Sequence, residues 1–209
     1  DRWLSGEADA ARWRGRALGS ARVTMIDDPT ARPGYGSYWF DDEGTLAAPT
    51  TLIDGGVLAR PVTDATTGAA LGLPSSANAR RAGALEAVSP RISNLAFAPG
   101  DASTAALLGA VDDGLLIEGA RAAWTDLASW RFTLRAARAR GLRGGRLSGH
   151  LYANVDLHGE VPALLASVEG ASAASGRFAA TCTDAGDRGE GVPVSIGGPF
   201  VLTRARVGS

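Results

Sequence analysis

Glycine and proline punctuate this sequence throughout its length, and that pattern limits the folds the chain can adopt. The 28 glycines and 10 prolines among 209 residues are scattered rather than gathered into one stretch. Scattered Gly and Pro favour many short connections, whereas a clustered run would favour a flexible linker. We therefore expect short strands joined by tight turns.

The composition limits the partners and the compartment. The chain is 45% hydrophobic and 21% charged with a net charge of −1, so neither a nucleic-acid partner nor a disordered polyelectrolyte is expected. It contains no apolar run of about 18 residues that would span a membrane. The single cysteine forms no internal disulfide, and no signal peptide is apparent, so we expect a cytoplasmic protein with one core.

The first twenty residues differ from the rest. Residues 1–20 are rich in charge and begin without Met. We expect them to be a lead-in segment from a longer chain, followed by one domain over residues 21–209.

The remaining pattern predicts a β-rich α+β fold with mostly antiparallel sheets and a few short helices. Asp54-Gly55-Gly56 between two apolar runs is a strong hairpin signal. Ser103 and Pro162 stand where a helix cap and a first helical turn are expected. Short helices are expected within 103–111 and 160–168, and at most a helical turn within 66–73. Strands are expected at 22–27, 50–53, 57–59, 131–139, 147–157, 192–196 and 200–207.

Two histidines lie within or beside the alternating stretch 147–157. In one continuous strand His150 and His158 would share a polar face about 26 Å apart. They would then not share a metal ion, and a solvated or interfacial face is the expectation.

Two charged clusters each have two interpretations. Asp41-Asp42-Glu43 would suit a paired-carboxylate or hard-cation site, but a charged turn before Gly44 is the commoner explanation. The arginines of 135–146 would suit phosphate, but their alternation with apolar residues fits the solvent face of a strand better.

Several short segments, in order, resemble those of the TldD/PmbA family of metallopeptidases. The resemblance covers most of residues 21–209. The segments are Ile26–Thr30, Gly36-Ser37 with Phe40–Gly44, Thr51–Ile53 with Gly56–Leu58, Asn78–Arg81, Pro90-Arg91 with Asn94, and Pro99–Asp101.

The tail resembles that of the metal-binding kind of subunit in this family. Cys182 precedes Val192-Pro193-Val194 and Gly197-Gly198-Pro199, as the family's cysteine precedes its V-P-V and G-x-P segments. The resemblance implies that Cys182 is a thiolate ligand of zinc, a soft donor that zinc accepts. The spacer 184–190 is longer than the family's and lacks its Lys and Gln. On the residues alone, a lone cysteine is more often a small buried hydrophobe.

The family's His-Glu-x-x-x-His helix does not occur in this sequence. The resemblance implies that this helix supplies two imidazole ligands and a general base, and its expected position is just before Asp1. We therefore assign no catalytic residue, and we expect this polypeptide alone to be inactive.

The resemblance implies the C-terminal domain of a zinc-dependent peptidase that cleaves small unfolded or modified peptides. Its implied partner is a TldE/PmbA-like subunit without metal. Arg91 and Asn94 are candidates for binding the peptide, although pinning of loops is an equal alternative. Two other functions stay open, namely a catalytically silent scaffold subunit and non-hydrolytic tailoring of peptides.

Overall fold

The chain forms two compact units rather than the single core that its length suggests. The computed structural model describes residues 12–126, 129–183 and 191–208. Unit 1 contains residues 23–98 and 175–198 with the N-terminal residues to Ala17, and unit 2 contains residues 18–22, 99–174 and 199 onward. Each unit has its own apolar cluster, one around Val194 and one around Ala136. The expectation of one domain over residues 21–209 stays a prediction.

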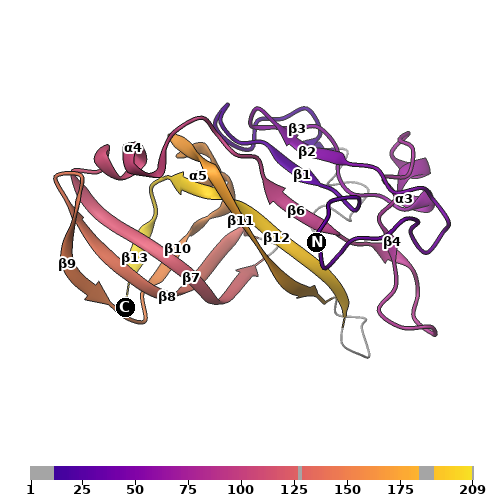
Figure 1. Ribbon diagram of the computed structural model, residues 1–209. Coiled ribbons are helices and arrows are strands. Elements are labelled where there is room, and N and C mark those ends of the chain that lie inside the picture. Colours follow the sequence, from indigo (N-terminus) through magenta and orange to yellow (C-terminus); the bar gives the residue numbers. More distant parts are fainter. Residues whose placement is uncertain (1–11, 127–128, 184–190, 209) are drawn as a thin grey trace. The chain divides into compact units, whose positions relative to one another are not determined.

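Unit 1 contains most of a six-stranded sheet. The strand order is β11-β12-β6-β1-β2-β3, and β11 and β12 also extend into unit 2 (Figure 1). β1 pairs antiparallel with β2 and β6, whereas β12 pairs parallel with β6. The elements are β1 (Met25–Asp27), β2 (Thr50–Asp54), β3 (Val57–Leu58), α3 (Ala65–Ala70), β4 (Ala79–Arg80), β5 (Ser89–Pro90), β6 (Asn94–Phe97), β11 (Gly170–Cys182) and β12 (Val192–Leu202).

The predicted hairpin is confirmed. β2 and β3 pair antiparallel on either side of Gly55 and Gly56, whose φ angles are 51° and 83°. Two successive positive φ angles suit glycine, because it has no Cβ to clash.

Unit 2 is built on a five-stranded antiparallel sheet with two short helices. The order is β13-β10-β8-β7, and β9 pairs with the far end of β8 (Figure 1). Ser103 Oγ caps α4 by accepting the Ala106 N–H at 3.0 Å, and Pro162 lies in the first turn of α5, as predicted. The elements are α4 (Thr104–Gly109), β7 (Asp113–Asp126), β8 (Arg131–Arg143), β9 (Arg146–Tyr152), β10 (Asp156–Glu160), α5 (Val161–Ala166) and β13 (Arg206–Gly208).

The single strand predicted over 147–157 was wrong. The chain forms β9, turns, and continues as β10, because Asn154 adopts a left-handed conformation with φ of 55°. Asparagine tolerates this conformation better than most residues. His150 and His158 therefore lie on different strands and do not share one continuous polar face.

The break predicted at Gly197-Gly198-Pro199 was also wrong. β12 runs through all three residues and ends at Leu202. A Cβ at Gly197 would lie 2.9 Å from the Gly176 carbonyl oxygen, and one at Gly198 would lie 3.1 Å from Phe97 Cβ. The glycines thus allow close approach of neighbouring strands and do not end the strand. Among the described residues, no helix has the length and apolar character needed to cross a membrane.

Candidate functional site

A buried carboxylate organises the centre of unit 1. Asp27, the last residue of β1, is fully buried. It accepts hydrogen bonds from Asn78 Nδ2 at 2.6 Å, from the Ser93 N–H at 2.8 Å and from Ser93 Oγ at 2.7 Å. Burial raises the pKa of Asp27, and the hydrogen bonds from Ser93 and Asn78 act against that rise. The carboxylate thereby joins β1 to two loops that the sequence leaves far apart.

Arg80 connects the same loops to the start of β12. Its guanidinium donates to the carbonyl oxygens of Ile92 at 2.8 Å and Pro193 at 2.9 Å. The cation also lies 5.1 Å from the ring centroid of Tyr38, a favourable cation–π distance. Desolvation lowers the pKa of Arg80. The guanidinium of Arg80 therefore stabilises the backbone at Ile92 and Pro193.

Arg91 performs a similar role at the end of β11. It is 4% exposed. Its Nε donates to Ser89 Oγ at 3.0 Å, and its Nη1 reaches the carbonyl oxygen of Cys182 at 3.4 Å. The structure therefore places Arg91 directly beside the proposed metal ligand.

The side chain of Asn94 forms hydrogen bonds to the loop that contains Gly36 and Ser37. Its Oδ1 accepts the Gly36 N–H at 3.1 Å, and its Nδ2 donates to the Asp28 carbonyl at 2.7 Å and to Ser37 Oγ at 3.0 Å. With both ends of the amide used internally, the geometry favours loop pinning for Asn94, and its burial at 1% exposure agrees. Substrate binding by Arg91 and Asn94 stays a prediction.

Cys182 ends β11 in a confined setting. It packs in an apolar cluster with Val192 and Val194 and is 7% exposed. Burial raises the pKa of its thiol, and the charge of Arg91 and a hydrogen bond from it oppose that rise. A Cβ on Gly191 would lie 2.5 Å from the Cys182 carbonyl oxygen. Contacts on both sides therefore fix the backbone that carries this thiol.

The acidic turn at 41–43 has structural partners. Asp41 accepts the Glu43 N–H at 3.1 Å within its own turn, and Asp42 accepts the Arg81 N–H at 2.8 Å. Glu43 accepts the Ala65 N–H, at the start of α3, at 2.8 Å. These contacts favour the charged-turn interpretation over an acid/base pair.

Four of the five arginines of 135–146 form ion pairs across strands. Such pairs on a solvated sheet face agree with the solvent-face interpretation and leave less charge for phosphate. The pairs are Arg135 with Asp156, Arg138 and Arg140 with Glu118, and Arg143 with Asp113.

The described residues supply one candidate metal ligand. A thiolate suits zinc, and the positive charge of Arg91 and Arg80 favours the thiolate form of Cys182. However, residues 12–126, 129–183 and 191–208 contain no group of three or more His, Cys, Asp or Glu side chains placed to hold a metal ion. The same arginines would also repel a cation. These residues alone do not form a catalytic zinc site, so no catalytic step is derived from them.

Fold and site define a strand-rich domain that holds one buried thiol in a fixed position. Residues 4–208 match the PmbA/TldA metallopeptidase C-terminal domain. The chain therefore belongs to the TldD/PmbA family, as its C-terminal domain. The resemblance seen in the short sequence segments is confirmed.

Individual relatives agree with this assignment. A metalloprotease of Methanothermobacter thermautotrophicus is 34% identical over 201 residues, which are 96% of this chain and 43% of the relative. A solved structure from Thermotoga maritima matches with a TM-score of 0.76 at 22% identity, covering 98% of this chain and 42% of its own. TldE from Thermococcus kodakarensis matches with a TM-score of 0.73 at 20% identity, covering 93% and 41%. This chain spans less than half the length of these relatives.

Sequence reasoning did not foresee the convergence on Asp27. Asp27, Asn78 and Arg80 lie in segments that resemble those of the family, but the sequence alone did not assign a role to any of them. No local signal was available, because the hydrogen bond between Asp27 and Asn78 joins residues that are far apart in the chain.

Proposed function

We propose that this chain is the C-terminal domain of a zinc-dependent peptidase and that Cys182 contributes a thiolate ligand. The observation that carries the proposal is the position of Cys182, buried and held at the junction of β11 and β12 in a metallopeptidase family member. The other ligands and the general base would come from the family's His-Glu-x-x-x-His helix elsewhere in the full-length protein. Such a metal supplies Lewis-acid activation of a carbonyl and of water.

The proposed substrates are small, unfolded or modified peptides in extended form. Support comes from β11, which lies at the edge of its sheet and leads to Cys182. Residues 175–179 of this edge strand are exposed. An exposed edge offers backbone donors and acceptors to an added strand without demanding a particular side chain.

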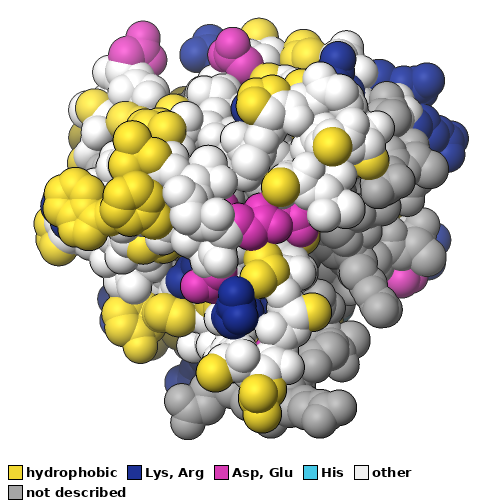
Figure 2. All heavy atoms as spheres, turned by 90° about the vertical axis from the view of Figure 1, so that its right-hand side faces the viewer, with side chains coloured by type: hydrophobic (Ala, Val, Ile, Leu, Met, Phe, Trp, Pro, Cys, Tyr) yellow, Lys and Arg dark blue, Asp and Glu magenta, His cyan; other side chains and the backbone are white. Residues whose placement is uncertain are grey.

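The proposed partner is a TldE/PmbA-like subunit without metal. Unit 1 exposes several large apolar side chains, and Figure 2, which looks onto the side of α3 and β4, shows hydrophobic side chains gathered toward one edge of that face. Such gathering is typical of protein interfaces. The exposed large apolar residues in the 35–46 loop are Tyr35, Trp39, Phe40 and Leu46.

A catalytically silent scaffold remains the second candidate. It is favoured by the arginines beside Cys182 and by the lack of a three-ligand group among the described residues. Retention of a cysteine at this point argues against it, because a subunit without metal has no use for a thiolate there.

Peptidase assays on the full-length protein test the proposal. With an unstructured peptide as substrate, we expect chelation to abolish cleavage and added zinc to restore it. Cys182→Ser should lower kcat/KM at least about 100-fold, because even outer-shell partners of a metal are worth 10–100-fold. Thr183→Ser, the matched control at the next and exposed residue, should retain activity. Cleavage that survives both chelation and Cys182→Ser would refute the zinc peptidase.

A further inference from the structure

A pocket of about 830 Å³ lies in unit 2, and none of its lining residues is among those described around Cys182. Its walls come from the start of β8, the end of β10, helix α5 and the segment that joins β12 to β13. All of these residues belong to unit 2.

Strand register gathers the polar residues of the pocket on one face. Arg206 of β13 is opposite His158 of β10, which is opposite Thr133 of β8. Glu160 and Arg131 form the next row on the same face, two residues along each strand. Residues that are directly opposite on neighbouring strands point to the same side. All five therefore line one surface.

The charge of this surface is mostly positive. Arg131, Arg204 and Arg206 line the pocket, and Glu160 is the one acidic residue among its described lining residues. Arg204 is already engaged by Glu169 at 2.8 Å. Arg131 and Arg206 are exposed and form no ion pair with any residue that the structure describes. Two guanidinium groups are thus available to a ligand.

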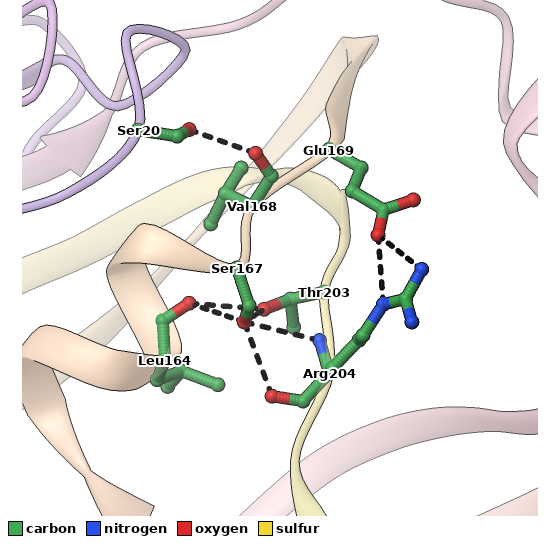
Figure 3. A network of polar contacts seen from close by, with 7 residues as sticks. All are labelled: Ser20, Leu164, Ser167, Val168, Glu169, Thr203 and Arg204. Carbon is green, nitrogen blue, oxygen red and sulfur yellow. Dashed lines mark hydrogen bonds and ion pairs between the residues drawn. The ribbon is translucent and has the colours of Figure 1, made fainter.

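The wall beside Arg204 is held in place by a hydrogen-bond network (Figure 3). Ser167, at the end of α5, places its Oγ 2.8 Å from the Leu164 carbonyl oxygen and 2.7 Å from Thr203 Oγ1. The same oxygen accepts the Arg204 N–H at 3.2 Å. Thr203 Oγ1 also donates to the Leu164 carbonyl at 3.0 Å. The segment before β13 is therefore tied to α5, and the pocket is formed before any ligand arrives.

The remaining lining is apolar and includes a positioned imidazole. Ala163 and Leu164 of α5 provide apolar surface. Thr133 Oγ1 lies 3.0 Å from His158 Nδ1, which fixes the orientation of the ring. Pockets that combine apolar walls with a few convergent polar groups bind small molecules.

We propose that this pocket binds an organic oxyanion, a carboxylate or a phosphate carried on an apolar group. Arg131 and Arg206 provide planar forks of N–H donors that match both kinds of oxyanion. Ala163 and Leu164 contact the apolar group. All of the residues that line this site belong to unit 2.

Isothermal titration calorimetry on the full-length protein tests the site with four probes. N-acetylphenylalanine presents a carboxylate and phenyl phosphate a phosphate, while N-acetylphenylalaninamide lacks the charge and inorganic phosphate lacks the apolar group. We expect one of the first two to bind at least about ten-fold more tightly than the latter two. The preferred oxyanion identifies the natural chemistry.

Variants locate the binding. Arg206→Gln and Arg131→Gln should each weaken the preferred probe about ten-fold, the size expected for one hydrogen bond to a charged group. Arg146→Gln, an exposed arginine of the same sheet outside the pocket, is the matched control and should bind normally. Thermal unfolding confirms that each variant is folded. Equal binding of the neutral amide, or normal binding by both pocket variants, overturns the proposal.

Discussion

Replacement of Asp27 by alanine is expected to lower the free energy of unfolding by about 3 to 5 kcal/mol, because three buried donors would lose their acceptor. Those donors are Asn78 Nδ2 and the N–H and hydroxyl of Ser93. Urea denaturation measures the change. Asp28→Ala is the matched control and should cost about 1 kcal/mol, since within the part of the chain that the structure describes the Asp28 carboxylate accepts hydrogen bonds only from Thr30, at the surface. Equal losses in the two variants would show that the Asp27 network does not organise unit 1.

The pH dependence of this effect has a definite sign. Burial raises the pKa of Asp27 in the folded protein, so its contribution to stability is fully present below its unfolded pKa of about 3.9. That contribution declines as the pH rises through the higher folded pKa. The stability difference between wild type and Asp27→Asn should therefore shrink from pH 4 to pH 7. A difference that grows over this range would mean that the hydrogen bonds outweigh desolvation.

Gly36→Ala is expected to destabilise the protein by about 3 kcal/mol, because the new methyl group would meet backbone that cannot move aside. A Cβ at this position would contact the Ser93 carbonyl oxygen and lie 2.8 Å from its carbon and 2.9 Å from Val194 Cα. The loop, β6 and β12 would have to separate. Thermal and chemical denaturation both report the loss.

Gly44→Ala is the control for this substitution. Gly44 has a φ of 80° and open space around its missing Cβ. Alanine there should lower the free energy of unfolding by only about 1 kcal/mol, because an L-residue is disfavoured in the left-handed conformation. If Gly36→Ala is no more harmful than Gly44→Ala, the close packing at Gly36 does not hold in solution.

Local signals in the sequence predicted the local structure well. Asp54-Gly55-Gly56 predicted the β2–β3 hairpin, and Ser103 predicted the start of α4. These features depend on residues within a few positions of each other, where turn and cap preferences dominate. The strand-rich fold class followed from the same signals.

Features that depend on distant neighbours were not predicted. Asn154 breaks a pattern that alternates like one strand, and Gly197-Gly198-Pro199 continues a strand although these residues usually end one. In the second case the deciding contacts are with Gly176 and Phe97, which are remote in sequence. Local propensity carries no information about such packing.

The residues of the candidate site came from the sequence, and their roles stay predictions. The tail pattern pointed to Cys182, and the structure places Arg91 beside it and Arg80 at the adjoining strand. The sequence offered Arg91 and Asn94 as peptide-binding residues, but it did not show that their hydrogen bonds go to the protein's own loops. Burial and partner identity are properties of the folded chain.

Metal content measured by mass spectrometry on the full-length gene product tests the role of Cys182 most directly. Because burial raises the pKa of the Cys182 thiol, zinc must displace its proton, and bound zinc should decline as the pH falls. At pH 7.5 we expect near-stoichiometric zinc in the wild type and in Thr183→Ser, and sharply reduced zinc in Cys182→Ser at matched purity. Absence of zinc from the wild type, or equal zinc in wild type and Cys182→Ser, would contradict the assignment of Cys182 as a metal ligand.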